Sequence, residues 1–168
     1  FKNSIIVISL PPNRDDHPKQ IRVELALNNL ECDPGLWKKI TSYHPNDQEN
    51  VRRSYLVNGP SQPNLVSFPC TDFRGKARRF NKAWYTEFKG WLEYSKEKDS
   101  AYCLFCYLFK QDIGDQAGGE KFVGVGFKNW KNKSSLNEHA KSDAHYQCQR
   151  KSQDLLNQNQ HIETALHN

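Results

Sequence analysis

Methionine is absent from the 168 residues of this sequence, and so is any long hydrophobic run. The longest apolar stretch near the start is residues 5–8, whereas a helix needs about 20 apolar residues to span a bilayer. No signal-peptide cleavage pattern precedes the break at Pro11 and Pro12. We therefore expect no membrane association. Because the sequence begins at Phe1 and lacks methionine, we also expect it to be a segment of a longer protein.

Cysteine is scarce as well, and its five copies are an odd number. An odd total fits a reducing compartment better than a disulfide framework. Cys32, Cys70 and Cys148 are expected to be free thiols. Cys148 follows His145 by three positions, so it is a substitute candidate for a metal ligand.

The other two cysteines belong to a pattern that metal chemistry explains. Cys103 and Cys106 are separated by two residues, and His139 and His145 follow with five residues between them. Thiolates and imidazoles at these spacings are the donors that a tetrahedral structural zinc ion prefers. The sequence therefore predicts one structural Zn²⁺ held by these four residues.

The local sequence predicts how the two cysteines reach one ion. Residues 101–109 are rich in residues that favour strands, and a straight strand would send side chains of opposite parity to opposite faces. The chain must therefore turn between Cys103 and Cys106. This predicts a zinc knuckle at the tip of a β-hairpin, with flanking aromatic side chains that exclude water.

The two histidines are predicted to come from helical structure. Ser135 and Glu138 have the spacing of a capping box, so a helix that carries His139 should begin there. Six helical positions rotate a side chain by about 240° beyond one full turn. The helix should therefore end near residues 141–143, so that His145 can face the same ion.

Other chemistry also uses two nearby cysteines. As buried core thiols, Cys103 and Cys106 would leave the histidines on a helix surface. A redox pair needs an exposed thiolate, whereas Leu104 and Phe105 lie in an aromatic run. A zinc deaminase needs His-x-Glu upstream and a proline before the first cysteine, and the sequence has neither. The core-thiol and redox interpretations stay as alternatives to the zinc site.

The ligands stand within a longer series of aromatic, basic and small residues. Its members are Arg78, Arg79, Phe80, Trp84, Phe88, Trp91, Leu92, Glu93, Tyr94, Ser95, Asp99, Ala101, Cys103, Cys106, Phe109, Gly126, Phe127, Trp130, Leu136, His139, Ser142 and His145. This series resembles the TTF-type zinc finger of transposases and transcription factors, which is related to MYM-type and BED-type fingers. The resemblance implies a DNA-binding module of a hAT-like, transposase-derived protein, located in the nucleus.

A second series lies upstream of the first. Its members are Asp33, Pro34, Gly35, Ile40, Tyr43, Val51, Arg52, Arg53, Tyr55 and residues 59–63. It is similar to the segment that precedes the finger in plant hAT-like transposase proteins, so the resemblance covers about residues 24–147. Trp37 departs from the pattern, because the family usually has a smaller basic residue after Asp-Pro-Gly-Leu.

Positive charge is concentrated around the predicted finger. Residues 73–151 contain 16 Lys and Arg against 9 Asp and Glu, a net charge of +7, whereas the whole chain carries +5. Two clusters of basic residues near the ligands are predicted to neutralise phosphates of double-stranded DNA. The first precedes the cysteines and consists of Arg74, Lys76, Arg78, Arg79 and Lys82, and the second lies between the cysteines and the histidines and consists of Lys128, Lys131 and Lys133. An ordinary solvated face is the alternative interpretation.

Hydrophobic spacing predicts four further helices. The signals are Val23, Ala26, Leu27 and Leu30 on one helical face, Asp33 and Pro34 as a helix start, residues 47–57 ending before Gly59, and the stripe of Phe80, Trp84, Phe88, Trp91 and Leu92. The stripe predicts the strongest amphipathic helix of the chain. We expect it to pack in the core, with base stacking as the alternative.

Together these patterns predict an α+β fold with three parts. Residues 1–72 form an N-terminal helical extension with a proline-rich connection, residues 73–150 form the zinc-stabilised finger of helix, β-hairpin zinc knuckle and helix, and residues 151–168 form a Gln/Asn-rich linker or tail. The predicted function is DNA binding, and the alternative is a zinc-stabilised protein-interaction or self-association module. No phosphate-loop pattern and no acidic triad for strand transfer is recognisable, so we expect no enzyme activity from this segment.

Overall fold

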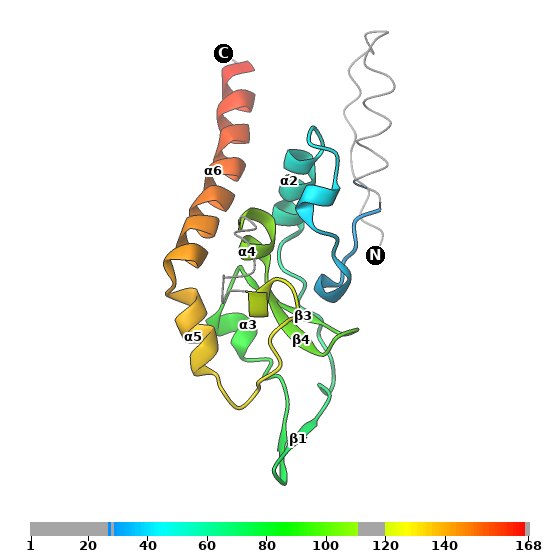
Figure 1. Ribbon diagram of the computed structural model, residues 1–168. Helices are drawn as coiled ribbons and strands as arrows, with labels where there is room; N and C mark the ends of the chain where they lie inside the picture. The colour runs from blue at the N-terminus through cyan, green and yellow to red at the C-terminus, as the bar shows by residue number, and fades with distance from the viewer. Residues whose placement is uncertain (1–26, 28, 111–119, 167–168) are drawn as a thin grey trace.

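The computed structural model describes residues 27, 29–110 and 120–166 (Figure 1). Its elements are, in chain order, the 3-10 helices η1 (Pro34–Leu36) and η2 (Ile40–Ser42), α2 (Gln48–Asn58), β1 (Thr71–Phe73), β2 (Lys76–Arg78), α3 (Trp84–Glu87), β3 (Leu92–Ser95), β4 (Ser100–Cys103), α4 (Leu104–Phe109), η3 (Glu120–Phe122), α5 (Ser134–Ala140) and α6 (Asp143–Leu166). Two small antiparallel sheets among helices confirm the predicted α+β class. No helix within the described ranges is long and apolar enough to cross a membrane.

The β3–β4 hairpin forms the centre of the fold. Its strands pair from Leu92 with Cys103 to Ser95 with Ser100, and every residue in both strands is buried. Phe127 extends the pairing through two backbone hydrogen bonds with Ala101. The neighbouring Gly126 has a φ of 80°, and a Cβ there would lie 2.5 Å from that of Ser100, so the close approach of this loop requires glycine.

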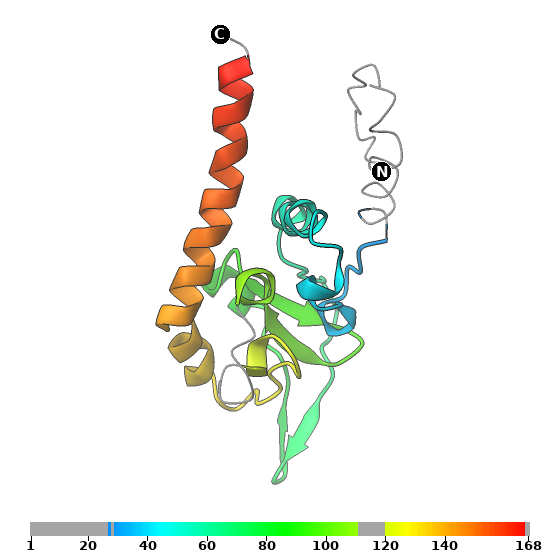
Figure 2. The same ribbon diagram turned by 45° about the horizontal axis from the view of Figure 1, so that its top comes forward.

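The β1–β2 hairpin lies apart from this centre. Thr71 pairs with Arg78 at its base, and Arg74 and Gly75 form its turn with positive φ values. Figures 1 and 2 both show this hairpin projecting from the body of the molecule, at the opposite end from the last turns of α6.

The segment before residue 60 packs on the hairpin and on α4. The Asp33 carboxylate accepts a hydrogen bond from the Gly35 backbone N–H at 2.8 Å, which confirms the predicted helix start, although the helix is a single 3-10 turn. Helix α2 matches the helix predicted over residues 47–57 and ends at Gly59. The predicted helical face of Val23 to Leu30 lies largely outside the described residues.

A second core joins this segment to the finger. Val51 and Tyr55 on α2 pack with buried residues of α4, and the Trp37 ring stacks on that of Tyr107 with centroids 4.0 Å apart. The tryptophan that departs from the family pattern is thus part of the interface with α4.

The aromatic stripe from Phe80 to Leu92 does not form one helix, which corrects the sequence prediction. Helical structure is limited to α3, and Leu92 begins β3. Gly90 has a φ of 90°, a conformation that does not continue a right-handed helix, and pairing with β4 then holds the chain extended. The expectation that the stripe is core is confirmed, because Phe80, Trp84, Phe88, Trp91 and Leu92 are all buried in the main hydrophobic cluster.

Two corrections concern α5 and α6. Helix α5 begins at Ser134 with Lys133 at its N-cap and no side-chain cap, so the predicted capping box does not form. The segment 151–168, predicted to be a linker or tail, continues as α6 to Leu166. The reason is a buried face on α6 that packs beside α4 and consists of His145, Cys148, Ser152 and Leu155.

Candidate metal centre

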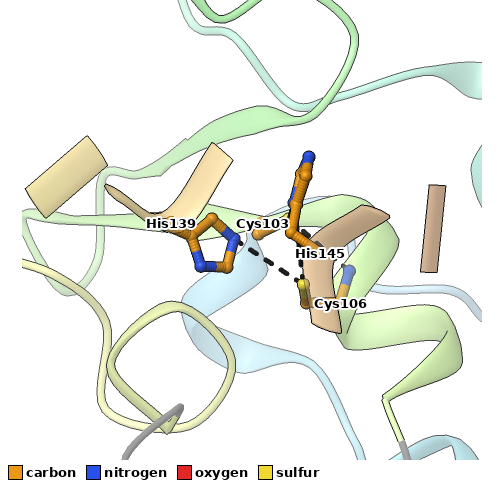
Figure 3. A group of neighbouring side chains, drawn as sticks. All are labelled: Cys103, Cys106, His139 and His145. Carbon is orange, nitrogen blue, oxygen red and sulfur yellow. Dashed lines mark hydrogen bonds between the residues drawn. The ribbon is translucent and has the colours of Figure 1, made fainter. Parts of the chain in front are cut away.

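The four predicted ligands come together from four different elements. Cys103 is the last residue of β4, Cys106 lies in α4, His139 lies on α5, and His145 lies in the first turn of α6. Figure 3 shows the four side chains gathered in one place, and their ligand atoms all lie within 4.8 Å of one another. Within the described ranges, this is the one group of His, Cys, Asp or Glu side chains arranged to hold a metal ion.

The cysteines do not lie at a hairpin tip, which corrects the predicted zinc knuckle. The turn of the β3–β4 hairpin lies between Ser95 and Ser100, whereas Cys103 pairs with Leu92 at the open end. Helix α4 begins at the next residue, and its first turn brings the Cys106 backbone N–H to 3.5 Å from the Cys103 sulfur. A helical turn therefore provides the change of direction that the sequence required, because side chains three positions apart share a helix face.

The helix is interrupted between the two histidines, as helical rotation requires. Helix α5 ends at Ala140 and α6 begins at Asp143, so the helical path is interrupted between His139 and His145 as predicted. The interruption lets both imidazoles face the cysteines, with His139 Nε2 directed at Cys106 and His145 Nδ1 directed at both sulfurs.

Three sulfur–nitrogen distances in the cluster fit one zinc ion. Bonds of about 2.3 Å to sulfur and about 2.0 Å to nitrogen at tetrahedral angles place a sulfur and a nitrogen about 3.5 Å apart. The structure has 3.4 Å from Cys103 Sγ to His145 Nδ1, 3.6 Å from Cys106 Sγ to His139 Nε2, and 3.8 Å from Cys106 Sγ to His145 Nδ1. The donor set is therefore that of a closed, four-ligand structural zinc site, with no position left for a reacting molecule.

Burial shifts the pKa values of the candidate ligands. It lowers the pKa of His139 to about 3 and also lowers the pKa of His145, so both rings are neutral at physiological pH and can bind metal. Contact with Cys103, together with burial, raises the pKa of the Cys106 thiol. A bound cation reverses that effect, because a coordinating thiol is deprotonated.

Aromatic rings enclose the ligand cluster. The Trp91 ring centroid lies 5.2 Å from that of His139 and 5.0 Å from that of His145, and the Phe122 ring lies 4.3 Å from His139. Phe105 packs against His145 from α4. The sequence predicted flanking aromatics on the hairpin, whereas Trp91 and Phe122 are contributed from before β3 and from η3.

Ser142 connects the two histidine ligands and was missed as a site residue. Its hydroxyl donates to the His139 carbonyl at 2.8 Å and accepts from the His145 backbone N–H at 3.2 Å. The signal that would have found it is a serine directly before the second helical segment, three positions ahead of a ligand. By this pair of bonds the serine fixes the backbone on both sides of the interruption.

The remaining cysteines stay outside the cluster of four. Cys32 and Cys70 are exposed, Cys148 is buried, and all are free thiols. Cys148 lies one helical turn beyond His145 on the α6 face that packs beside α4. Its place as a substitute ligand remains a prediction that the variants described below test.

Three of the eight predicted DNA-contacting residues lie at one groove. Arg78 lines a groove together with Lys128 and Lys131. The other members of the two clusters lie on the β1–β2 hairpin (Arg74 and Lys76) or make contacts of their own, since Arg79 donates to Ser67, Lys82 contacts Asn64, and Lys133 forms an ion pair with Glu87 at 2.7 Å.

Comparison with known proteins points to one group. Residues 120–168 match the family model DUF4371, described as the ZMYM1/FAM200 RNase-like domain. The chain is 31% identical over 150 residues to zinc finger MYM-type protein 5 of Homo sapiens, over 82% of this chain and 20% of that protein. It is 35% identical over 133 residues to the Mus musculus protein of the same name, over 73% of this chain and 19% of that protein. No solved structure matches the chain.

Each of these similarities covers only part of a protein. The chain spans about a fifth of the length of the relatives it matches, and the family model covers η3, α5 and α6 with the loop between them. Together with the Cys/His centre, they support a zinc-finger module that carries one structural zinc. The relationship they support is to the MYM-type zinc finger and FAM200 proteins, and not to the TTF-type finger specifically.

Proposed function

We propose that this chain is a zinc-dependent module that binds double-stranded DNA and belongs to a transposase-derived nuclear protein. The observation that carries the proposal is the meeting of two basic clusters that are about fifty residues apart in sequence. Arg78 from the first cluster and Lys128 and Lys131 from the second line one groove, and no acidic side chain lines it with them. A groove lined by positive charges and by no negative charge attracts the phosphates of a duplex.

The β1–β2 hairpin supports a duplex partner by its shape. Arg74 and Lys76 are exposed on a two-stranded ribbon that projects from the body (Figures 1 and 2). The major groove of B-form DNA admits a two-stranded ribbon. In this arrangement the ribbon enters a groove while the cations at its base contact the backbone.

The zinc ion has a structural part in this function. Cys103, Cys106 and His145 are nearly inaccessible, and the four donors complete a tetrahedral set. Zinc bound there would fix β4, α4, α5 and α6 relative to one another and so hold the loop with Lys128 and Lys131 beside the hairpin. The proposal assigns no catalytic step to this chain, and the RNase-like description applies to the matched family.

Binding of the zinc-loaded chain to a labelled duplex tests the proposal. We expect fluorescence anisotropy to show binding at low salt that weakens as a linear function of log salt concentration. Chelation of zinc should abolish it, and readdition of zinc should restore it. Absence of duplex binding by zinc-loaded, folded protein at low salt would refute the proposal.

Helix α6 favours a second candidate function, a module for protein interaction or self-association. In both views its C-terminal turns run past α2 and α4 (Figures 1 and 2), and Tyr146 and Leu156 on this helix are exposed. A helix that extends beyond its own domain offers a surface to another protein segment. Concentration-dependent sedimentation in the absence of DNA binding would favour this candidate.

A further inference from the structure

The groove at the base of the β1–β2 hairpin has a composition suited to one kind of ligand. It is lined by Thr71 and Arg78, which pair with each other across the hairpin, and by residues 128–131 from the loop before α5. Three of its side chains are cationic, and the Thr71 hydroxyl and the Asn129 amide add further hydrogen-bonding groups. Because none of its lining residues carries a negative charge, the groove suits an anion.

Two residues that line this groove each have a buried nitrogen donor that lacks an acceptor among the described residues. They are Nε1 of Trp130 and Nε of Arg78. Trp130 is 6% exposed, and its ring is fixed by packing against Phe80 and Phe127, with centroids 5.6 and 5.9 Å away. An indole nitrogen can only donate, and a guanidinium can only donate, so both groups require an oxygen acceptor.

Leaving such donors unpaired is unfavourable, because a buried polar group loses its hydrogen bonds to water. Two unpaired donors at one groove therefore indicate an acceptor-rich ligand rather than a packing defect. A phosphate group satisfies this requirement best, since its oxygens point in several directions and Arg matches their geometry.

We propose that the groove formed by Thr71, Arg78 and residues 128–131 binds one phosphate group, with Arg78 Nε and Trp130 Nε1 as donors to its oxygens. Lys128 and Lys131 supply long-range attraction. The identification of the natural ligand as a DNA backbone phosphate rests on the proposed function, whereas the groove's affinity for phosphate does not. An indole donor at a phosphate adds a neutral, directional contact that the charge pattern alone does not reveal.

Nuclear magnetic resonance of the indole N–H groups tests the proposal directly. The chain has four tryptophans, so its ¹⁵N spectrum contains few indole signals, and Trp130→Phe identifies the relevant one. Inorganic phosphate is titrated into the zinc-loaded protein in one arm and a short duplex in the other, with acetate at equal ionic strength as the control. We expect a saturable shift of the Trp130 indole signal in both arms and none with acetate. The Trp37 indole, which donates to the Glu31 carbonyl, is the internal reference.

A conservative substitution provides the second readout. Arg78→Lys keeps the charge but removes the guanidinium fork, and it should weaken phosphate and duplex binding about tenfold. Arg150→Lys, at an exposed position on α6, is the matched control and should leave both unchanged. Unlike a change at the packed Trp130, neither substitution removes a ring from the core, so folding is preserved.

The outcomes separate this inference from the proposed function. Indole shifts with phosphate but no duplex binding would support the phosphate site and refute DNA binding. Duplex binding without a Trp130 shift, and with Arg78→Lys equal to wild type, would refute the phosphate site while leaving DNA binding intact. Equal shifts with acetate would also refute it, because the groove would then lack selectivity for phosphate.

Discussion

The carboxyl group of Glu93 accepts a hydrogen bond from the Ser61 backbone N–H at 2.8 Å, although the two residues lie on opposite sides of the predicted domain boundary. Glu93 is 1% exposed, and its second oxygen has no partner among the described residues. Burial raises the pKa of this carboxyl well above its ordinary value, against the opposing effect of the Ser61 bond. The proline-punctuated connection is thus held to β3 by a buried acid.

The raised pKa of Glu93 predicts a pH dependence of stability. The folded state binds the Glu93 proton more tightly than the unfolded chain does. The stabilisation from this proton is therefore fully present below the ordinary pKa of 4.5, and it declines as the pH rises toward the folded-state pKa. Glu93→Gln keeps the acceptor for Ser61 without a titrating group. We expect denaturant unfolding of the zinc-loaded variant to show a smaller loss of stability than wild type as the pH rises above 4.5. Equal pH dependence in the two proteins would contradict the prediction.

The metal centre predicts one zinc ion per chain and a fold that depends on it. Cys103→Ala should unfold the finger, because structural zinc contributes on the order of 10 kcal/mol of folding free energy. Metal analysis and circular dichroism before and after chelation provide the measurement. His145→Ala should lose stoichiometric zinc, whereas Cys148→Ala should keep it. The reverse result would make Cys148 the fourth ligand, and cooperative folding of protein without zinc would overturn the site.

Ser142 predicts an effect on zinc affinity from a residue that does not bind the metal. Ser142→Ala removes both hydrogen bonds to the histidine backbones, so we expect about tenfold weaker zinc binding and about 1 kcal/mol lower stability. Competition with a chromophoric chelator measures the affinity. Ser134→Ala, at the first residue of α5, is the control, and similar affinities for the two variants would argue against this role.

The packing of Trp91 against both imidazoles predicts that this ring has a structural role. Trp91→Ala should cost about 3 kcal/mol or more through lost burial and a cavity, and DNA affinity should fall only as far as the folded fraction falls. Thermal unfolding and duplex binding are measured on the same samples. A variant with normal stability and no nucleic-acid binding would show instead that the ring stacks on bases.

The basic cluster predicts a change in salt dependence. Each neutralised phosphate contact contributes about −0.9 to the slope of log affinity against log salt, so the Arg78→Ala, Arg79→Ala double variant should have a flatter slope than wild type. Base preference should survive, because phosphate contacts position a protein without specifying sequence. The Lys89→Ala, Arg150→Ala double variant matches its charge and should retain the wild-type slope. Identical slopes for all three proteins would remove the cluster from the interface.

The spacing of ligand residues was enough to predict which four side chains lie together, because zinc chemistry limits both donor type and separation. The break before His145 was also predictable, since helical rotation alone requires it. The position of the cysteines on the hairpin was not, because a turn between Cys103 and Cys106 is satisfied equally by a hairpin tip and by the start of a helix.

Tertiary packing determines the elements that were predicted incorrectly from the sequence. Phe80 to Leu92 has helical spacing, yet Gly90 and the pairing of Leu92 with Cys103 divide it between a short helix and a strand. The polar composition after residue 150 predicted a linker, whereas Ser152 and Leu155 continue a buried face that begins at His145. Composition averages conceal such a face, because only one side of the helix carries it.

The second oxygen of Asp33 extends to the other end of the central hairpin, where it accepts hydrogen bonds from the backbone N–H groups of Lys96 and Glu97 at 2.9 and 3.3 Å. One end of the hairpin is therefore secured by the metal ligand Cys103, and its turn is secured by a residue about sixty positions earlier. Removing the chain before residue 73 would leave the turn amides without this acceptor and would expose the α4 surface that Trp37 and Tyr55 cover. We therefore expect that the smallest segment able to fold on its own includes Asp33, well upstream of the first metal ligand.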